Sequence, residues 1–247
     1  MHKNYLPLNQ HFINNPIAHR GLHNEVVSEN SLQAFSLAKE KGYAIEIDVH
    51  LLKDGNVAIV HDSNLKRVTG YDVIIEDLTK DDLDKYPLFN KEKIPLLTEL
   101  LSLINGEVPL LIEIKASKLN KPLCDKLLEI LSTYPFKDKI ALQSFEPNTV
   151  KYLKKKTNDY SVGYLCTNKL SDIKCKLIES LLVKMKLLSW MKADFISYDI
   201  YFLPNKYVKA KQEKGYQILV WTINSEERLQ KAREIGDNII FERIDLN

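Results

Sequence analysis

The feature that most constrains the fold is a regular alternation of short apolar runs with longer helix-like stretches along the chain. The runs that we expect to form strands are Ile17–His19, Ala44–Leu52, Val57–His61, Leu110–Lys115, Ile140–Ser144, Ser161–Leu165, Phe195–Tyr198, Ile218–Thr222 and Asn238–Phe241. Helices are expected at Ser31–Lys41, with Asn30 as its N-cap, and at Leu96–Ile104, Lys121–Leu131, Pro147–Lys155, Ile173–Met191, Asn205–Gly215 and Ser225–Ile235. Strands that alternate with helices predict parallel pairing and an α/β fold.

One link between two of these strands is too short for a parallel connection, which needs a dozen or more residues. The Lys53-Asp54-Gly55-Asn56 segment contains Asp-Gly, which is a strong hairpin signal. We therefore expect Val57–His61 to run antiparallel beside Ala44–Leu52. If Asp54 and Gly55 form the turn, His61 lies opposite Asp48 and on the same face as Glu46.

Removing the return strand of this hairpin leaves eight strands, the number that a closed (β/α)8 TIM barrel uses. Such a barrel typically needs about 250 residues, and the chain has 247. We therefore expect one domain over residues 1–247. The hydrophobic share of 45% excludes wholesale disorder, and the net charge of +2 gives no electrostatic argument for nucleic acid as a partner.

The cysteines and the N-terminus predict a cytoplasmic protein. Cys124, Cys166 and Cys175 form no CxxC pair, and their odd number argues against a disulfide framework or a zinc cluster. The N-terminal residues lack a basic region followed by an apolar run, so we expect no signal peptide. The lysine-rich stretch Ile173–Met191 is compatible with a membrane surface, but an outer barrel helix is favoured, and we expect no membrane association.

Three carboxylates in strand-like runs are the first candidates for chemistry. Glu46 and Asp48 are two residues apart, so they project from the same face of one strand. Two buried carboxylates repel unless a cation lies between them, and Mg²⁺ and Ca²⁺ prefer such ligands. Glu113 has a similar setting, with Lys115 on its face. A lysine beside a metal-binding glutamate suggests an anionic ligand such as a phosphate, whereas an ordinary salt bridge is the alternative.

Two histidines end strands close to these carboxylates. His19 ends the first strand, and His61 ends the return strand of the hairpin. A histidine titrates near neutral pH, so the pair can supply a general base and a general acid. Arg20 offers a bidentate phosphate donor. His50 is two residues after Asp48, so its side chain is expected on the same face of the strand. We nevertheless expect the hairpin to place it beyond the site.

These residues resemble the signature of the glycerophosphodiester phosphodiesterases, which reads HR…ExD…HD. It is present in order as His19-Arg20, Glu46-x-Asp48 and His61-Asp62. Further matches are Glu29-Asn30, Asp54-Gly55, Leu65-x-Arg67-x-Thr69-Gly70, Ile94-Pro95-x-Leu97, Glu113-x-Lys115, Gln143-Ser144-Phe145 and Trp221-Thr222-x-Asn224. The resemblance runs from about residue 16 to about residue 242.

The resemblance implies a role for each of these positions. Glu46, Asp48 and Glu113 are expected to hold one divalent cation, Mg²⁺ or Ca²⁺. His19 and His61 are the expected acid–base pair, Arg20 and Lys115 the phosphate contacts, and Trp221 an aromatic wall beside the glycerol moiety or, alternatively, a core residue. Glu29 is expected to orient a histidine or a ligand, or only to help the following helix begin. Residues 63–94 stand where the family has a small lid-like insertion, and its shortness favours small, exposed head groups.

The resemblance implies metal-dependent hydrolysis of a small-molecule glycerophosphodiester to glycerol 3-phosphate and an alcohol. The sequence leaves open which histidine is the base and whether water or a glycerol hydroxyl is the nucleophile. One alternative is a lysophospholipase D-type or sphingomyelinase D-type enzyme that acts on lipids. A second is a phosphodiester-binding barrel without catalysis. The family's usual Ile-Thr-Asp-x-Pro ending is absent, because the last strand reads Ile239-Ile240-Phe241-Glu242-Arg243.

Overall fold

The computed structural model describes residues 5–168, 182 and 184–246. Its strands are β1 (Ile17–His19), β2 (Ala44–Leu51), β3 (Val57–Ile59), β4 (Leu110–Ile114), β5 (Ile140–Ser144), β6 (Ser161–Cys166), β7 (Phe195–Asp199), β8 (Gln217–Ile223) and β9 (Asn238–Phe241). Each predicted strand is present, and the ends differ from the prediction by at most two residues.

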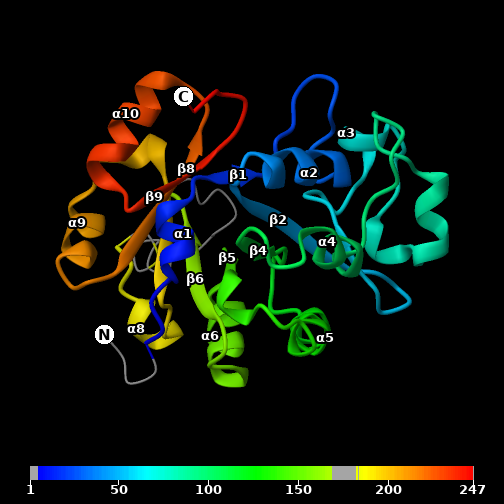
Figure 1. Cartoon of the computed structure of the whole chain (residues 1–247). Helices are drawn as coiled ribbons and strands as arrows, with labels where there is room; N and C mark the ends of the chain where they lie inside the picture. The colour runs from blue at the N-terminus through cyan, green and yellow to red at the C-terminus, as the bar shows by residue number, and fades with distance from the viewer. Residues whose placement is uncertain (1–4, 169–181, 183, 247) are drawn as a thin grey trace.

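The α-helices of the described residues lie around these strands (Figure 1). They are α1 (Gln10–Asn14), α2 (Leu32–Glu40), α3 (Lys66–Thr69), α4 (Leu97–Ile104), α5 (Lys121–Ser132), α6 (Pro147–Lys156), α8 (Leu188–Met191), α9 (Lys206–Gln212) and α10 (Glu226–Ile235). Short 3₁₀ turns lie at η1 (Ile75–Asp77), η2 (Lys80–Lys85), η3 (Lys137–Lys139) and η4 (Ile200–Phe202). Most of the helix predicted over residues 173–191 lies outside the described residues.

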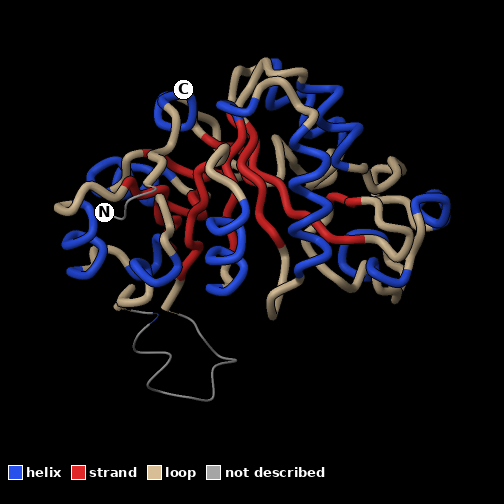
Figure 2. The backbone as a smooth tube through the Cα atoms, turned by 90° about the horizontal axis from the view of Figure 1, so that it is seen from below, coloured by secondary structure: helices blue, strands red, loops and turns tan. Residues whose placement is uncertain are grey.

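The sheet closes on itself. Its strand order is β1-β9-β8-β7-β6-β5-β4-β2-β3, and β1 also pairs with β2, which joins the two ends. All of these pairings are parallel except the one between β2 and β3. Figure 2 shows the strands gathered at the centre with helices outside them. The chain is therefore a (β/α)8 barrel with one added antiparallel strand, as the sequence predicts.

The interior of the barrel is built in layers, because alternate residues of each strand point inward. One buried cluster contains an apolar residue from each of seven strands: Ile17, Ala44, Leu111, Ala141, Phe195, Leu219 and Ile240. Two residues further along each of these strands, or just past its end, lie His19, Glu46, Glu113, Gln143, Ser197, Trp221 and Glu242. Ser197 Oγ donates to Gln143 Oε1 over 2.6 Å across the barrel. The interior is thus apolar at one end and mostly polar toward the carboxyl ends of the strands.

The N-terminal segment covers the apolar end of the barrel. Leu8 and Phe12 belong to the same buried cluster as the apolar layer, and Phe12 lies on α1. The amide of Asn238 donates to the carbonyl oxygens of Phe12 and Asn15, which ties α1 to the start of β9. Among the described residues this end is closed by packing, so the carboxyl ends of the strands are the end that is left for a ligand.

The β2–β3 hairpin forms as predicted, but with a different register. Leu51 pairs with Val57 and Val49 with Ile59, so the prediction that His61 lies opposite Asp48 is wrong by one residue. The cause is a three-residue loop, Lys53–Gly55, in which Gly55 takes the left-handed conformation with φ of 83°. The Val60 N–H therefore donates to Asp48 O, and His61 lies beyond the end of β3.

The start of α2 also differs from the prediction. Ser31 is the N-cap, because its hydroxyl accepts from the Ala34 N–H at 3.1 Å. Asn30 instead has φ of 54°, and its side chain turns toward the barrel.

Residues 63–94 form a unit on one side of the barrel, to the right in Figure 1. Their apolar side chains pack on the β2–β3 hairpin in a cluster of their own: Leu65, Val68, Ile75, Leu78, Leu83, Leu88 and Ile94 lie with Leu52, Ala58 and Val60. The hairpin thus serves as the platform on which this segment folds. A lid-like role for it stays a prediction.

No helix among the described residues is long and apolar enough to span a bilayer. Cys124 and Cys166 are buried free thiols, and Cys175 lies outside the described residues.

The barrel interior generates a prediction at Gly163 on β6. A Cβ at this position would overlap the ring of Phe195 on the neighbouring strand. We expect Gly163→Ala to lower the free energy of unfolding by about 1–3 kcal/mol, measured by urea denaturation.

The control is the double variant Gly163→Ala/Phe195→Leu, in which the smaller side chain makes room for the methyl group. It should be more stable than additivity of the two single variants allows. Strict additivity would show that the two side chains do not compete for this space.

Candidate active site

Three carboxylates meet at the polar end of the barrel. Glu46 and Asp48 come from β2 and Glu113 from β4, where Asp48 and Glu113 are register partners. All three are buried, and one oxygen of each lies within 4.8 Å of the others. Asp48 Oδ1 has no hydrogen-bond partner within the described residues. A buried set of oxygen ligands with an unsatisfied oxygen is the arrangement that a hard divalent cation fits.

The electrostatics of this cluster show strain between like charges. Burial, together with the charges of Asp48 and Glu113, raises the pKa of Glu46 well above its usual value. Burial also raises the pKa of Glu113. Burial would raise the pKa of Asp48 as well, but the charges of Lys115 and Arg20 outweigh it and hold that pKa low. A bound divalent cation would offset the repulsion among the three groups.

Two cations border the carboxylates. Lys115 Nζ lies 2.7 Å from Glu113 Oε1 and 3.5 Å from Asp48 Oδ1. Arg20 Nε lies 3.3 Å from Asp48 Oδ2, and the Arg20 N–H donates to Glu46 Oε2 at 3.2 Å. Both side chains are mostly buried, so their charges act in a medium of low dielectric. They make the rim of the cluster positive and suited to a phosphate.

Glu29 anchors the arginine. Its Oε1 accepts from Arg20 Nη1 at 2.8 Å, and both of its oxygens accept from the guanidinium of Arg67. Arg67 in turn donates to Asp62 Oδ2 at 2.6 Å. This chain of bonds links the loop after β1 to α3 in the segment 63–94. Glu29 thus contacts Arg20, and its expected role in orienting a histidine or a ligand stays a prediction.

The two histidines are held in the same way. His19 Nδ1 lies 2.7 Å from Glu242 Oε2, and His61 Nδ1 lies 2.6 Å from Asp62 Oδ1. A carboxylate can only accept, so each Nδ1 carries a proton, and in the neutral imidazole Nε2 keeps its lone pair. His19 Nε2 lies 3.9 Å from Glu46 Oε2. Burial lowers the pKa of both histidines, which favours the neutral imidazole.

Trp221 lies in the same polar layer, on β8. Its ring meets the ring of Phe145 edge to face, with the ring centroids 5.6 Å apart. Its Nε1 is buried and has no partner within the described residues. Trp221 is half-buried and also packs on the apolar cluster inside the barrel, so it borders both the core and the site.

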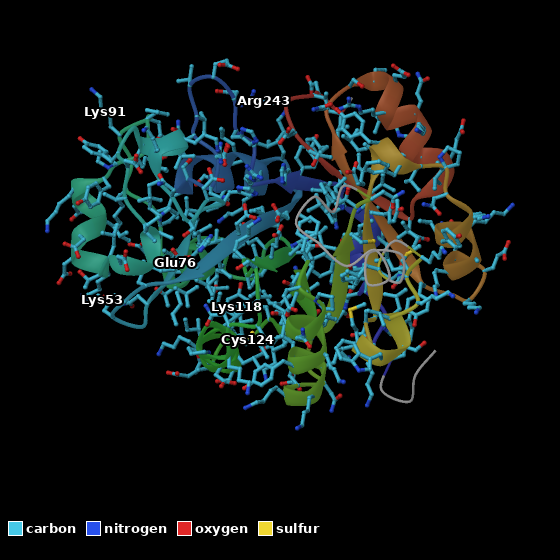
Figure 3. The ribbon with its side chains drawn as sticks, turned by 180° about the vertical axis from the view of Figure 1, so that it is seen from behind. Lys53, Glu76, Lys91, Lys118, Cys124 and Arg243 are labelled. Atoms are coloured by element: carbon cyan, nitrogen blue, oxygen red, sulfur yellow. The ribbon has the colours of Figure 1, made fainter. Side chains whose placement is uncertain are left out.

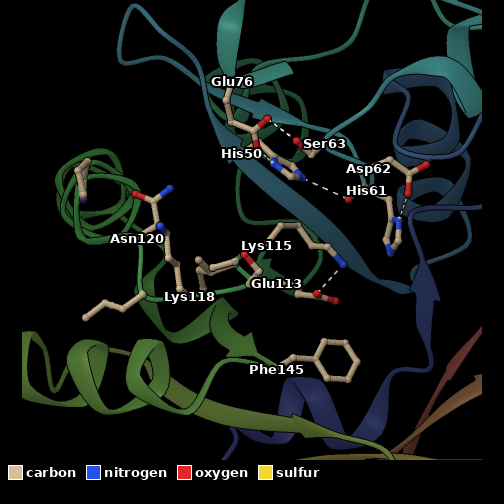
Figure 4. Close-up of a pocket in the computed structure, with 15 residues that line it drawn as sticks. His50, His61, Asp62, Ser63, Glu76, Glu113, Lys115, Lys118, Asn120 and Phe145 are labelled. Atoms are coloured by element: carbon tan, nitrogen blue, oxygen red, sulfur yellow. Dashed lines mark hydrogen bonds and ion pairs between the residues drawn. The ribbon is translucent and has the colours of Figure 1, made fainter. Parts of the chain in front are cut away.

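A cavity of about 660 Å³ is lined by Glu113, Lys115 and His61 (Figure 4). Its walls come from the β4–α5 loop, from the start of the segment 63–94 and from the ring of Phe145. Glu76 and Lys118, labelled in Figures 3 and 4, belong to the two facing walls. The expectation that His50 lies beyond the site is wrong. It lines this cavity, bound to Glu76 at 2.6 Å and to the carbonyl oxygen of His61 at 3.2 Å.

Sequence reasoning missed two polar contacts of the site. Asn30 Nδ2 donates to Asp48 Oδ2 at 3.0 Å, because the left-handed backbone at Asn30 aims its side chain inward. Glu242 was noticed only as part of an unusual ending, although it stands two residues after the inward-facing Ile240. This spacing of two residues places Glu242 on the inward face, and it was the signal in the sequence that could have identified Glu242 as a site residue. Asn30 carried no such signal.

Comparison with known proteins gives the same assignment as the residues. Residues 19–246 match the model of the glycerophosphoryl diester phosphodiesterase family. The chain belongs to this family. A glycerophosphodiester phosphodiesterase from Caldanaerobacter subterraneus subsp. tengcongensis is 28% identical over 91% of this chain and 92% of its own. A lysophospholipase D from Homo sapiens is 25% identical over 92% and 82%.

Solved structures support the fold. A glycerophosphodiester phosphodiesterase from Thermotoga maritima superposes with a TM-score of 0.74 at 27% identity, over 92% of this chain and 94% of that one. A phosphodiesterase from Oleispira antarctica, solved with the product sn-glycerol-3-phosphate, gives a TM-score of 0.77 at 24% identity over 92% of both chains.

The Glu29 network generates a prediction about pH. Burial alone would raise the pKa of Glu29, but the bonds and charges of Arg67 and Arg20 outweigh it and lower the pKa to about 2. A lowered pKa stabilises the folded state above pH 4.5, and this stabilisation is lost as the pH falls toward about 2. We expect Glu29→Gln to cost about 1–3 kcal/mol at pH 7, and the difference from wild type to shrink below pH 4.5.

Urea denaturation across this pH range measures the difference. Glu25→Gln is the control, because Glu25 is 92% exposed and its nearest cation, Arg243, lies 3.7 Å away. Its effect should be small at every pH. A Glu29→Gln deficit that stays constant down to pH 3 contradicts the prediction.

Proposed function

We propose that this chain hydrolyses glycerophosphodiesters to glycerol 3-phosphate and an alcohol, with the site described above. The observation that carries the proposal is the convergence of three buried carboxylates, two phosphate-binding cations and two carboxylate-held histidines at the open end of one barrel. Membership of the family supports the same reaction.

Glu46, Asp48 and Glu113 are the proposed ligands of a divalent cation. Their hard oxygen donors favour Mg²⁺ or Ca²⁺ over metals that prefer nitrogen or sulfur. When bound, such a cation polarises a phosphoryl oxygen and balances the negative charge of the site.

Side chains of the protein bind the phosphate, transfer the protons and position the substrate. Arg20 and Lys115 bind the non-bridging oxygens of the phosphodiester, and their positive charge stabilises the charge that grows there in the transition state. One histidine, as the neutral imidazole, takes the proton of the nucleophile through its free Nε2. The other acts as the imidazolium, with a proton on Nε2 as well as on Nδ1, and gives the Nε2 proton to the leaving alcohol. Glu29 holds the Arg20 guanidinium in place, and Trp221 with Phe145 forms an aromatic wall beside the substrate.

The cavity favours a soluble substrate. Beyond Lys115 and His61 its lining includes Ser63, Glu76 and Asn120, whose side chains suit a polar head group better than an acyl chain. A lysophospholipid is the second candidate, favoured by the exposed apolar side chains of Val26 and Phe89, which line a smaller cavity beside Glu29 and Arg67.

The first test is turnover of glycerophosphocholine, followed by the release of glycerol 3-phosphate. We expect EDTA to abolish activity and Mg²⁺ or Ca²⁺ to restore it, because the carboxylate cluster needs a cation. His61→Ala should lower kcat by roughly 10²- to 10⁴-fold without loss of the folded state.

Lys137→Ala is the matched control, since this lysine pairs with Asp159 at the surface and touches no residue of the site. Its activity should equal that of wild type. Wild-type turnover by His61→Ala, or turnover in EDTA equal to that with a cation, contradicts the proposal.

The second test separates the substrate classes. Rates are compared for glycerophosphocholine, glycerophosphoethanolamine and lysophosphatidylcholine below its micelle concentration. We expect kcat/KM to be at least about tenfold higher for the water-soluble diesters, because the cavity wall is polar. A preference for lysophosphatidylcholine would reassign the enzyme to the lysophospholipase D type.

A further inference from the structure

Glu242 stands immediately after β9, and its side chain turns into the polar end of the barrel. Its Oε2 accepts from His19 Nδ1 over 2.7 Å. Ile240, two residues earlier, belongs to the apolar layer inside the barrel, so the period of the strand directs Glu242 to the same side. His19 holds the corresponding position on β1, which is paired with β9. The contact is therefore set by the register of two adjacent strands.

The backbone and a second histidine hold Glu242 in this position. The Glu242 N–H donates to Ile223 O at 2.9 Å, which extends the β8–β9 ladder past the end of the strand. His23 Nε2, itself buried and without a hydrogen-bond partner in the described residues, lies 3.7 Å from Glu242 Oε2. The bond from His19 and the nearby His23 hold the pKa of the Glu242 carboxyl well below its usual value. Glu242 is thus a carboxylate anion that is held beside the imidazole ring of His19.

An anionic carboxylate determines the tautomer of the histidine that it contacts. Because it can only accept, His19 must carry its proton on Nδ1, and Nε2 then keeps a lone pair. Nε2 is the atom that faces the cluster, at 3.9 Å from Glu46 Oε2. With the proton on Nε2 instead, His19 would have no lone pair on the side of the substrate and could not accept a proton there. The arrangement parallels the carboxylate–histidine pair of other hydrolases.

We infer that Glu242 is the positioning residue for His19: it selects the Nδ1–H tautomer and aims Nε2 at the reacting phosphodiester. The inference rests on the proposed function and deepens it, because it places a group of the C-terminal loop in the acid–base machinery. It also accounts for the ending Phe241-Glu242-Arg243, which the motif comparison treated only as a departure. Arg243, labelled in Figure 3, lies 3.7 Å from the exposed Glu25 of the loop after β1.

The test uses three variants of the full chain and measures kcat and KM separately. In Glu242→Gln the amide can donate to Nδ1 and so stabilise the wrong tautomer. We expect kcat to fall about 10²-fold or more while KM changes less than about threefold. Glu242→Asp keeps the charge and should recover part of kcat. Asp138→Asn is the matched control, because Asp138 faces a surface histidine, His11, at 3.8 Å and no residue of the site.

A spectroscopic readout tests the inference independently of activity. Long-range ¹H–¹⁵N correlation spectra of histidine-labelled protein report which ring nitrogen carries the proton, with His19→Asn used to assign the signal. We expect Nδ1–H in the wild type and in Glu242→Asp, and a shift of the proton to Nε2 in Glu242→Gln. Thermal unfolding of each variant checks that it is folded.

The outcomes are distinct. Unchanged kcat and an unchanged tautomer in folded Glu242→Gln overturn the inference, and so does a rise in KM with kcat unaffected. If the wild type itself turns over no glycerophosphodiester, the proposed function fails, whereas the tautomer shift still decides the role of Glu242. If Glu242→Gln does not fold, Glu242→Asp and the wild-type tautomer decide: Nε2–H in the wild type overturns the inference.

Discussion

The balance of charge at the carboxyl ends of the strands is the constraint on which the rest of the structure depends. Glu46, Asp48 and Glu113 are buried together, and only Arg20 and Lys115 lie close enough among the described residues to offset them by direct ion pairs. Burying three like charges is costly unless cations and hydrogen bonds compensate. The raised pKa values of Glu46 and Glu113 show that two side-chain cations do not complete this compensation. A divalent cation among the three carboxylates would complete it.

The barrel accommodates these buried charges because each strand contributes to two layers of its interior. The apolar layer stabilises the fold, and the polar layer carries the groups of the site. The inward-facing residues at the start of the strands are apolar and close-packed with Phe12 of α1. Two residues further along, the same strands present polar groups, which hydrogen-bond to one another across the interior, as Ser197 does with Gln143. Burial of the first layer stabilises the fold and so holds the second layer rigid. The polar groups are then positioned for chemistry without having to stabilise the fold themselves.

Much of the fold and site could be predicted from the sequence, because both depend on local periodicity. Alternation of apolar runs with helix-like stretches identified the strands, and the period of two placed Glu46 with Asp48 and Glu113 with Lys115. The hairpin register was wrong by one residue, since Asp-Gly fits both a two-residue turn and a three-residue loop with Gly55 at the left-handed position. Asn30 was assigned to a helix cap, because a sequence does not show that its backbone turns left-handed toward Asp48.

Two contacts that motif spacing does not show join elements far apart in the chain. Arg67 reaches Glu29 from the segment 63–94, and Glu242 reaches His19 from the last strand. Motif spacing describes residues that are close in sequence. These pairs form only in the folded chain, in which, for example, β9 lies beside β1. Such contacts are set by topology, and a single sequence shows one partner at a time.

The measurement that tests the central claim most directly is a crystal structure of the chain soaked with Ca²⁺ and sn-glycerol 3-phosphate. The charge balance predicts the cation among Glu46, Asp48 and Glu113, with the phosphate between it and the Arg20 and Lys115 side chains. It also predicts the Nε2 atoms of both histidines facing the phosphate. A cation bound elsewhere, or a phosphate that contacts neither Arg20 nor Lys115, would contradict the assignment of this end of the barrel as a phosphodiesterase site.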